Sequence, residues 1–557
     1  MKKKYVRWTL WTIASPFILF IILCILIYLP PIQNFLVDKA AVYASEATGM
    51  NISVGRISLS FPLNLVVTDV DAASPHNDTL LSVRRLQVNV QLLPLLKKQV
   101  EVDGISLQGA TVNSNDLIHG MKLNGTLGEL FISSHGVALD PETAIVNKVL
   151  LKDTDLSLCL NDTAAADTAA SDTTYWKIIL QDIDLQNVSF ALDMPLDSLS
   201  LAASLDNAIL RDGLIDLHKS AYSLQTFRIE NGRVRYDNGK PLAADSLSSG
   251  LDPSHIALTD IGVKLDSLYY GGRNMKAIIS QFVLKERSGV EIVSATGRMV
   301  SNDKVLRVPS LKLETRDSYL ELNVAMDWNA LDFKDEGLVS ARLMADIGKP
   351  DVVRFMGSMD EKFIRQYPSE PLRIRTGIDG DLNKLKLTTL TAELPGALGL
   401  FARGELTHLT DSLLRGGDIT LEAETKDLKF VSTLAEGIEI PYGTRLEGKF
   451  TMAGTKMGTD LLLMQPEAQA VVAADTIPIT VYNDSISVAD DFKMERAARL
   501  FAKYDLSRDR YEADLAVNHF DLHQFMPADS LYTLSTRLKV EGEGFDFFSP
   551  RTYFKAE

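Results

Sequence analysis

The stretch SVGRISLSFPLNLVVTDV, residues 53–70, alternates between apolar and polar side chains. Because successive side chains of a β-strand point to opposite faces, the stretch predicts a strand with one apolar face. A second run, LQVNVQLLPLL at 86–96, continues the same pattern. The residues that we expect to share an apolar face are Ile57, Leu59, Phe61, Leu63, Leu65, Val67, Leu86, Val88 and Val90.

The composition is that of a folded, acidic protein. Of the 557 residues, 46% are hydrophobic and 23% are charged, which leaves ample material for a core, and the net charge is −16. An acidic chain without a basic stripe argues against binding nucleic acid, whose phosphates require clustered Lys and Arg. The two cysteines, Cys24 and Cys159, make no disulfide framework.

The N-terminal sequence MKKKYVRWTLWTIASPFILFIILCILIYLPP predicts a membrane anchor. Thr9 to Leu29 carry no charge and are long enough to span ~30 Å of hydrocarbon as a helix. The preceding lysines should hold the N-terminus in the cytoplasm. A cleaved signal peptide is the competing interpretation, but its apolar region is shorter and is followed closely by a cleavage site. We therefore expect a single-pass anchor with residues 30–557 outside the cytoplasm.

Beyond the anchor the sequence predicts mostly antiparallel strands. Helical spacing favours an amphipathic helix next to the membrane, and from about residue 50 the apolar period changes to two. Short helices are expected at 351–368 and 427–437, and the pattern at 489–500 fits either a helix or a strand. The rest of this part of the chain is predicted to be mostly strands and turns. The expected segments are 1–29 (cytoplasmic stub and anchor), 30–49 (amphipathic helix), 50–160 (N-terminal β region), 161–174 (low-complexity loop), 175–346 (β region) and 347–557 (β region with short helices).

Hairpins are predicted where turn residues separate short apolar runs. The segments 100–112, 178–192 and 224–237 each read as strand, tight turn, strand, with Asn-Gly at 231–232 and at 238–239 as good hairpin turns. Further hairpins are expected to pair 289–300 with 304–315 and 499–507 with 510–517. The pieces ISLQGATV, IDLQNVSF and FRIENGRV resemble one another at irregular spacing, which does not indicate a strict solenoid.

No motif indicates catalysis. His519 and His523 are the only closely spaced histidines, and on the strand predicted there they would lie ~13 Å apart, too far to share a metal. HExxH, GxSxG and phosphate-loop motifs do not occur in the sequence. We expect neither an enzyme nor a metal or cofactor site.

Several long stretches share a recognisable pattern. After the lysine-led anchor these are LVDKAAVYASEATGMNISVGRISLSFPLNLVVTDV, DTLLSVRRLQVNVQLLPLLKKQVEVDGISLQGATV, LDPSHIALTDIGVKLDSLYYGG, KERSGVEIVSATGRM and DLHQFMPADSLYTLSTRLKVEGEGFDFFSPRT. These stretches resemble AsmA-like proteins, in particular the long TamB-like members from Bacteroidota. The resemblance rests on pattern and phrasing rather than on an invariant chemical motif.

The resemblance implies an elongated, curved β-sheet with an apolar groove along its length. The family is associated with phospholipid movement between inner and outer membranes, and TamB itself with assembly of outer-membrane proteins. Such proteins are usually longer and end in a domain that meets an outer-membrane barrel of the BamA type. This chain ends in mid-pattern at SPRTYFKAE, so we expect an N-terminal portion that lacks the barrel contact.

The expected function is therefore lipid transport in the bacterial envelope. The nine apolar residues of the first paragraph would line the start of a groove for phospholipid acyl chains, in a protein anchored in the inner membrane with its bulk in the periplasm. A scaffold or chaperone for outer-membrane protein insertion, which uses exposed strand edges, is the alternative. A closed β-sandwich core would explain the same alternation without any ligand.

Asp-Ser and Asp-Thr pairs recur along the chain. In an acidic β protein such pairs commonly begin turns. They also resemble the acceptor motif for O-glycosylation of exported proteins in Bacteroidota. The candidate acceptors are Thr79, Thr163, Thr168, Ser198, Ser246, Ser267, Ser412, Thr476, Ser485 and Ser530.

Overall fold

In a computed structural model, the chain forms two compact units, each built around β-sheet. The first comprises residues 1–243 and 252–287, and the second comprises 244–251 and 288–557. The residues that the structure describes are 39, 41, 42, 45, 50–60, 64–74, 79–90, 102–114, 121–139, 142–161, 176–239, 250–332, 336–356, 360–434, 437–466, 481–482, 485–486, 494–527, 530, 532–544 and 553–557.

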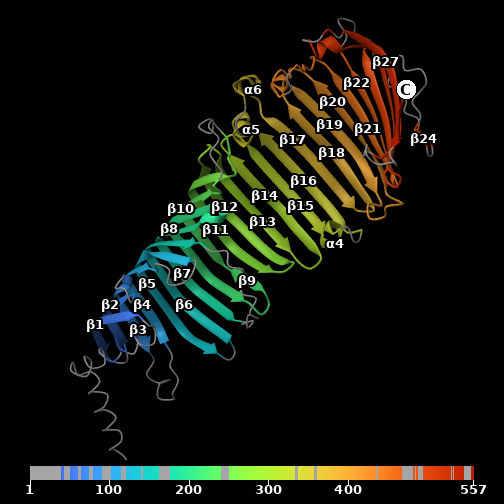
Figure 1. Cartoon of the computed structure of the whole chain (residues 1–557). Coiled ribbons are helices and arrows are strands. Elements are labelled where there is room, and N and C mark those ends of the chain that lie inside the picture. Colours follow the sequence, from blue (N-terminus) through green and yellow to red (C-terminus); the bar gives the residue numbers. More distant parts are fainter. Residues whose placement is uncertain are drawn as a thin grey trace, which may run out of the picture. The chain divides into compact units, whose positions relative to one another are not determined.

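In the first unit the first eight strands are neighbours in the sheet in chain order (Figure 1). The pairings are antiparallel except that β6 and β7 are parallel, and β8 pairs with both β9 and β10, which in turn pair with β11. The strands are β1 (Asn51–Ser60), β2 (Asn64–Ala73), β3 (Thr79–Val90), β4 (Val102–Asn113), β5 (Met121–Leu139), β6 (Glu142–Leu160), β7 (Lys177–Met194), β8 (Leu199–Asp216), β9 (Ala221–Leu224), β10 (Thr226–Asp237), β11 (His255–Gly271) and β12 (Asn274–Glu286).

The second unit is an antiparallel meander in which β22 pairs with β25, while β23 and β24 form a separate two-residue ladder. Its strands are β13 (Glu291–Ser301), β14 (Val305–Thr315), β15 (Tyr319–Asp327), β16 (Leu338–Ile347), β17 (Leu372–Asp381), β18 (Lys384–Leu394), β19 (Leu398–Thr407), β20 (Gly416–Thr425), β21 (Arg445–Ala453), β22 (Lys456–Met464), β23 (Val481–Tyr482), β24 (Ser485–Ile486), β25 (Ala497–Asp505), β26 (Arg510–Asp521), β27 (Thr533–Glu543) and β28 (Tyr553–Ala556).

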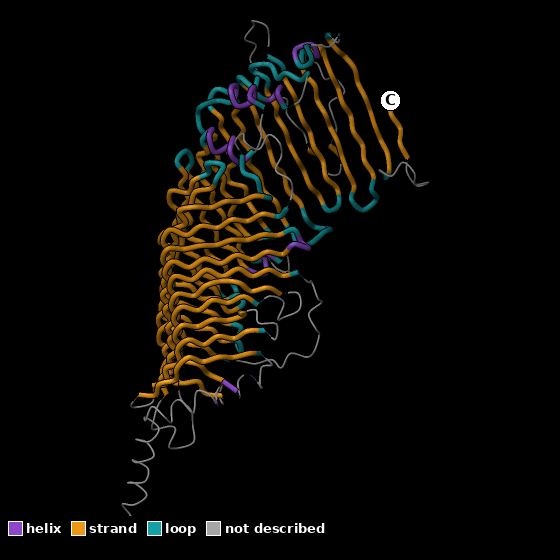
Figure 2. The backbone as a smooth tube through the Cα atoms, turned by 60° about the vertical axis from the view of Figure 1, so that its left-hand side comes forward, coloured by secondary structure: helices purple, strands orange, loops and turns teal. Residues whose placement is uncertain are grey.

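From β1 onward, the helices of the described residues are short and lie between strands. Figure 2 shows them beside the strand ends rather than along a strand. They are η1 (Pro195–Asp197), α4 (Trp328–Leu331), α5 (Lys349–Phe355), α6 (Glu361–Gln366), η2 (Val431–Thr433) and η3 (Leu522–Gln524). The expectation of a nearly all-β, mostly antiparallel chain with few short helices is confirmed, and the parallel pair β6–β7 is the departure from it.

The buried apolar core of the second unit lies at the ends of its strands. In one cluster Phe363 of α6 packs with Tyr367 and Phe430, at ring-centroid distances of 5.6 and 5.7 Å, beside the ends of β17, β18 and β19. A second cluster joins Ala330 of α4 to Val339 and Leu382. These two are the buried clusters found among the described residues.

Two sequence predictions about strand boundaries are wrong. Residues 53–70 form two strands, since Ser60 pairs with Asn64 at the end of the β1–β2 ladder. The sequence places Pro62, which has no N–H to donate, between them. The segments 100–112, 178–192 and 224–237 lie within, or nearly within, single strands, so Asn231-Gly232 is no hairpin turn but interrupts the β10 ladders as a bulge.

The other element predictions are mixed. The hairpins β13–β14 and β25–β26 are confirmed, and residues 497–500 belong to strand β25. The segment 351–368 contains α6 and most of α5 instead of one helix; Val352 packs against the core, whereas Phe355 is 57% exposed. Among its described residues, the segment 427–437 contains only the one-turn η2.

Much of the N-terminal prediction falls outside the described residues. This applies to the expected anchor Thr9 to Leu29 and to the loop 161–174, except Asn161. Within the expected helix at 30–49, the described residues Lys39, Ala41, Val42 and Ser45 are helical. In the part of the chain that the structure describes, no helix has the length and apolar character needed to span a bilayer.

Candidate functional site

Two rows of apolar side chains cross the whole sheet of the first unit. Residues paired directly across neighbouring strands place their side chains on the same face. The first apolar row consists of Ile57, Val67, Leu86, Leu107, Leu130, Leu151, Leu185, Ala208, Ile229, Val263 and Phe282. The second apolar row consists of Leu59, Leu65, Val88, Ile105, Ile132, Val149, Ile183, Leu210, Phe227, Leu265 and Ile279.

These rows are not buried like a core. Nearly every side chain in them is half-buried; the exceptions are the small Ala208, which is 2% exposed, and Ile105, which is 37% exposed. Both buried apolar clusters found among the described residues belong to the second unit. A continuous apolar sheet face that keeps contact with solvent is typical of a binding surface.

The structure brings together most of the residues predicted to line a groove. Ile57, Val67 and Leu86 are direct neighbours in the first row, and Leu59, Leu65 and Val88 are direct neighbours in the second. Val90 is the last residue of β3 and pairs with Val102 of β4. Phe61 and Leu63 lie outside the described residues.

A polar corner row runs beside the first apolar row. Its residues fall in gaps of the ladder registers: Gly55 lies opposite Asp69, and Asp153 lies between Gly128 and Asn187. A Cβ on Gly55 would come within 2.9 Å of the Asp69 Cβ, which shows how closely the corner residues approach. In chain order the corner row consists of Gly55, Asp69, Arg84, Gly109, Gly128, Asp153, Asn187, Asp206 and Asn231.

The corner row bends the strands that it crosses at the same level. The strands that run in one direction each place there a residue with positive φ, as in Asp69 (54°), Gly109 (62°), Asp153 (50°), Asn187 (50°) and Asn231 (54°). Gly, Asn and Asp are the residues that tolerate this left-handed conformation. Figure 2 shows the stacked strands of the first unit curving together.

The corner also explains the pieces that resemble one another in the sequence. ISLQGATV, IDLQNVSF and FRIENGRV place Gly109, Asn187 and Asn231 at equivalent positions. The apolar residues step by two up to the corner and by three across it, as in Leu185 and Val188. Because a bulge shifts the alternation by one residue, the apolar side chains remain on one face on both sides of the bend.

An apolar hollow lies beyond the corner. It has a volume of about 380 Å³, and its lining includes Phe190, Ala203, Val234 and Leu258. These four residues form a cross-strand row from β7 to β11, so the apolar face is hollowed there. Sequence reasoning missed this part because the change in alternation was interpreted as a turn.

The apolar face of the second unit follows the same plan. A row of mostly apolar side chains crosses its sheet from β13 to β27, through Leu322, Leu343, Leu390, Leu421 and Leu461 among others. Asp460 and Arg499 lie on the opposite face, where both are over 90% buried and joined by two hydrogen bonds of 2.8 and 2.5 Å. These two residues are 39 positions apart, and nothing in the sequence signalled their pairing.

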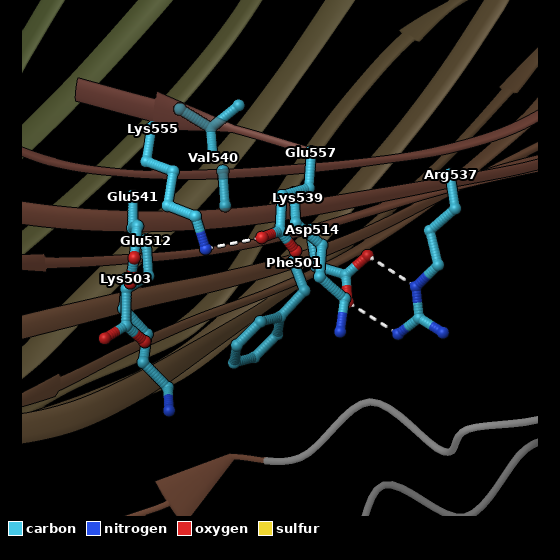
Figure 3. Close-up of a pocket in the computed structure, with 11 residues that line it drawn as sticks. Phe501, Lys503, Glu512, Asp514, Arg537, Lys539, Val540, Glu541, Lys555 and Glu557 are labelled. Carbon is cyan, nitrogen blue, oxygen red and sulfur yellow. Dashed lines mark hydrogen bonds and ion pairs between the residues drawn. The ribbon is translucent and has the colours of Figure 1, made fainter.

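A charged hollow of about 360 Å³, lined in part by Phe501, lies in the second unit (Figure 3). Arg537 donates two hydrogen bonds of 3.0 and 2.6 Å to Asp514, and Lys555 pairs with Glu557. The hydrogen bond from Arg537 lowers the pKa of Asp514, against the opposing effect of burial. The lining residues, all of them described, include no histidine, cysteine or hydroxyl nucleophile, so they form an ion-pair network rather than a catalytic constellation.

The histidines and metal-ligand types form no metal site within the described part of the chain. Groups of three or more His, Cys, Asp or Glu side chains suited to a metal do not occur there. His519 lies in β26, whereas His523 lies in the one-turn helix η3 and stacks on Tyr532. The strand predicted to hold both histidines therefore ends between them.

The candidate glycosylation acceptors are scattered. Thr79, Ser198, Ser412 and Ser530 are exposed, and Ser267 is half-buried in β11. Ser485 belongs to the short strand β24. The remaining acceptors, Thr163, Thr168, Ser246 and Thr476, lie outside the described residues.

No protein-family model, curated protein or solved structure matches this chain.

Proposed function

We propose that the protein holds phospholipid acyl chains on the apolar face of its sheet and conducts lipids between the inner and outer membranes of a bacterial envelope. Residues 9–29 would anchor it in the inner membrane, with the sheet in the periplasm. The observation that carries the proposal is the pair of apolar rows, which cross eleven strands of the first unit and stay half-exposed.

The chemistry of the rows suits acyl chains. Each methylene moved from water onto an apolar surface contributes ~0.8 kcal/mol, so a lipid tail gains several kcal/mol without any specific contact. Neither row contains a charged or polar side chain. Because neighbouring strands lie only ~4.8 Å apart, a tail meets an almost uniform surface and can shift along it without a large barrier.

The headgroup would remain in water at the rim of the sheet. Transferring a charged phosphate out of water is unfavourable in free energy, whereas transferring the apolar tail out of water is favourable. No step in this mechanism needs a catalytic residue. The direction of flow must come from elsewhere, because a uniform apolar surface favours neither end.

Photo-crosslinking in cells tests the proposal. The probe is placed at Leu107 of the first apolar row and, in a separate strain, at Ser106, which precedes it in β4 and faces the other side. Both side chains are half-buried, so the pair controls for accessibility. Phospholipid adducts at Leu107 and not at Ser106 are expected. A folded chain without adducts at Leu107 refutes the proposal and favours a closed core or the scaffold function.

A second arm separates conduction from local binding. With the probe at Leu185, three strands further along the same row, the substitution Leu107→Asp places a charge in the path. Conduction predicts fewer lipid adducts at Leu185, while Ser106→Asp leaves them unchanged. Unchanged adducts in both variants would show that lipids reach Leu185 without passing Leu107.

A further inference from the structure

Two neighbouring turns form a tip at one end of the strands in the first unit. Leu217–Ser220 join β8 to β9, and Gly272–Arg273 join β11 to β12. The turns are adjacent because Ala221 pairs with both Asp216 and Gly271. We call residues 217–222 and 269–276 the turn tip.

Two tyrosines place an aromatic surface at this tip. Tyr222 and Tyr270 pair directly across β9 and β11, and their rings stack at 6.2 Å with an interplanar angle of 29°. They are 40% and 47% exposed. On one side they continue to Ile215 and on the other to Met275, so the pair extends the apolar face to the strand ends.

The same tip is cationic in an acidic protein. Its two segments, LHKSAY and YYGGRNMK, contain Lys219, Arg273 and Lys276 together with His218, and no Asp or Glu. The nearest acidic neighbour in sequence is Asp216, which is 8% exposed and accepts a hydrogen bond from the backbone N–H of Lys219 at 3.0 Å. The chain as a whole carries −16, so the positive charge of the tip is a local departure.

We infer that the turn tip binds the phosphate headgroups of anionic phospholipids whose tails lie on the apolar face; this inference rests on the proposed function. Tyrosine combines an apolar ring with a hydroxyl that donates hydrogen bonds, which suits the boundary between tail and headgroup. Lys219 and Arg273 extend this boundary with charges that attract phosphate. The site therefore selects for lipids with net negative headgroups.

The test compares two pairs of charge-removing substitutions in the full chain in detergent. The tip pair is Lys219→Gln/Arg273→Gln, and the control pair is Lys148→Gln/Lys152→Gln, two exposed cations of β6 in the same unit. Binding of phosphatidylglycerol and of phosphatidylcholine is measured for each in mixed micelles. Every variant also carries the photo-crosslinking probe at Leu107, which reports lipid on the apolar face.

The tip pair is expected to weaken phosphatidylglycerol binding about 25-fold, at about fivefold per cation, and to change phosphatidylcholine binding much less. The control pair should change the binding of either lipid by less than about twofold. Equal losses for both pairs, or no loss for the tip pair while lipid adducts at Leu107 persist, overturn the headgroup site alone. Absence of adducts at Leu107 in the unsubstituted chain overturns the proposed function and the headgroup site with it.

Discussion

Replacing Asn187 tests the corner that bends the sheet. Asn187 has φ = 50°, a conformation that costs a residue with a Cβ about 1–2 kcal/mol, less for Asn than for Ala. Asn187→Ala and Asn187→Gly both remove the 2.9 Å hydrogen bond to Asp153 Oδ1, so that loss cancels in the comparison. Glycine escapes the φ penalty but loses about 0.4–1 kcal/mol through its more flexible unfolded chain. The alanine variant should therefore be less stable than the glycine variant by about 1 kcal/mol.

Ser189, two positions along the same strand, provides the control because its φ is not positive. There the order should reverse, with Ser189→Ala more stable than Ser189→Gly, as is usual inside a strand. Hydrogen–deuterium exchange of peptides covering β7, in the full chain in detergent, reports the local opening free energy that both comparisons need. If Asn187→Ala proves as stable as Asn187→Gly, the corner does not depend on left-handed backbone and the reasoning is refuted.

Three further predictions concern the second unit, and each is read from urea unfolding. Phe363→Ala should lower the free energy of unfolding by about 3–5 kcal/mol because it leaves a cavity in the strand-end core. Phe355→Ala, at an exposed position, should change it by less than about 0.5 kcal/mol. Equal effects of the two substitutions would contradict the packing described. Asp460→Asn should lower the free energy of unfolding by about 3–5 kcal/mol because it leaves Arg499 buried without its charge partner. The double replacement Asp460→Leu/Arg499→Met should recover most of this lost stability. The pKa of Asp514 is lowered in the folded state, so its ionised form stabilises the fold above the unfolded pKa of about 3.9, and this stabilisation is lost as the pH falls through the lower folded pKa. Asp514→Asn should therefore flatten the dependence of the unfolding free energy on pH between about 5 and 2. An unchanged slope would contradict this role of Asp514.

Local alternation was enough to predict strands, and it placed Ile57, Val67 and Leu86 on one face correctly. It failed at the corner because Asn231-Gly232 suits a hairpin turn and a bulge equally well. Both need positive φ, and only the pairing with β8 and β11 decides between them. Long-range pairing likewise decides that β6 and β7 are parallel, which no local signal announces.

The sequence predicted an apolar sheet face as the candidate site, but it located only part of that face. The first three strands show clean alternation, so their apolar residues were found directly. The continuation through Leu151, Leu185 and Phe282 was not, because it depends on register across strands far apart in the chain. The tyrosine pair at the turn tip joins β9 to β11 and gives no signal in either segment alone.

The corner row has a consequence for how such a chain can change in length over evolution. In the antiparallel part of the first unit, a strand with a positive-φ residue alternates with one that supplies an ordinary partner, as Asp69 alternates with Gly55 and Arg84. Duplicating or deleting one strand would bring two like corners together and reverse the chain direction of all that follows. Duplicating a whole hairpin preserves the alternation, the bend and both apolar rows. Growth in steps of two strands can therefore change the length of the chain while it retains the same surface.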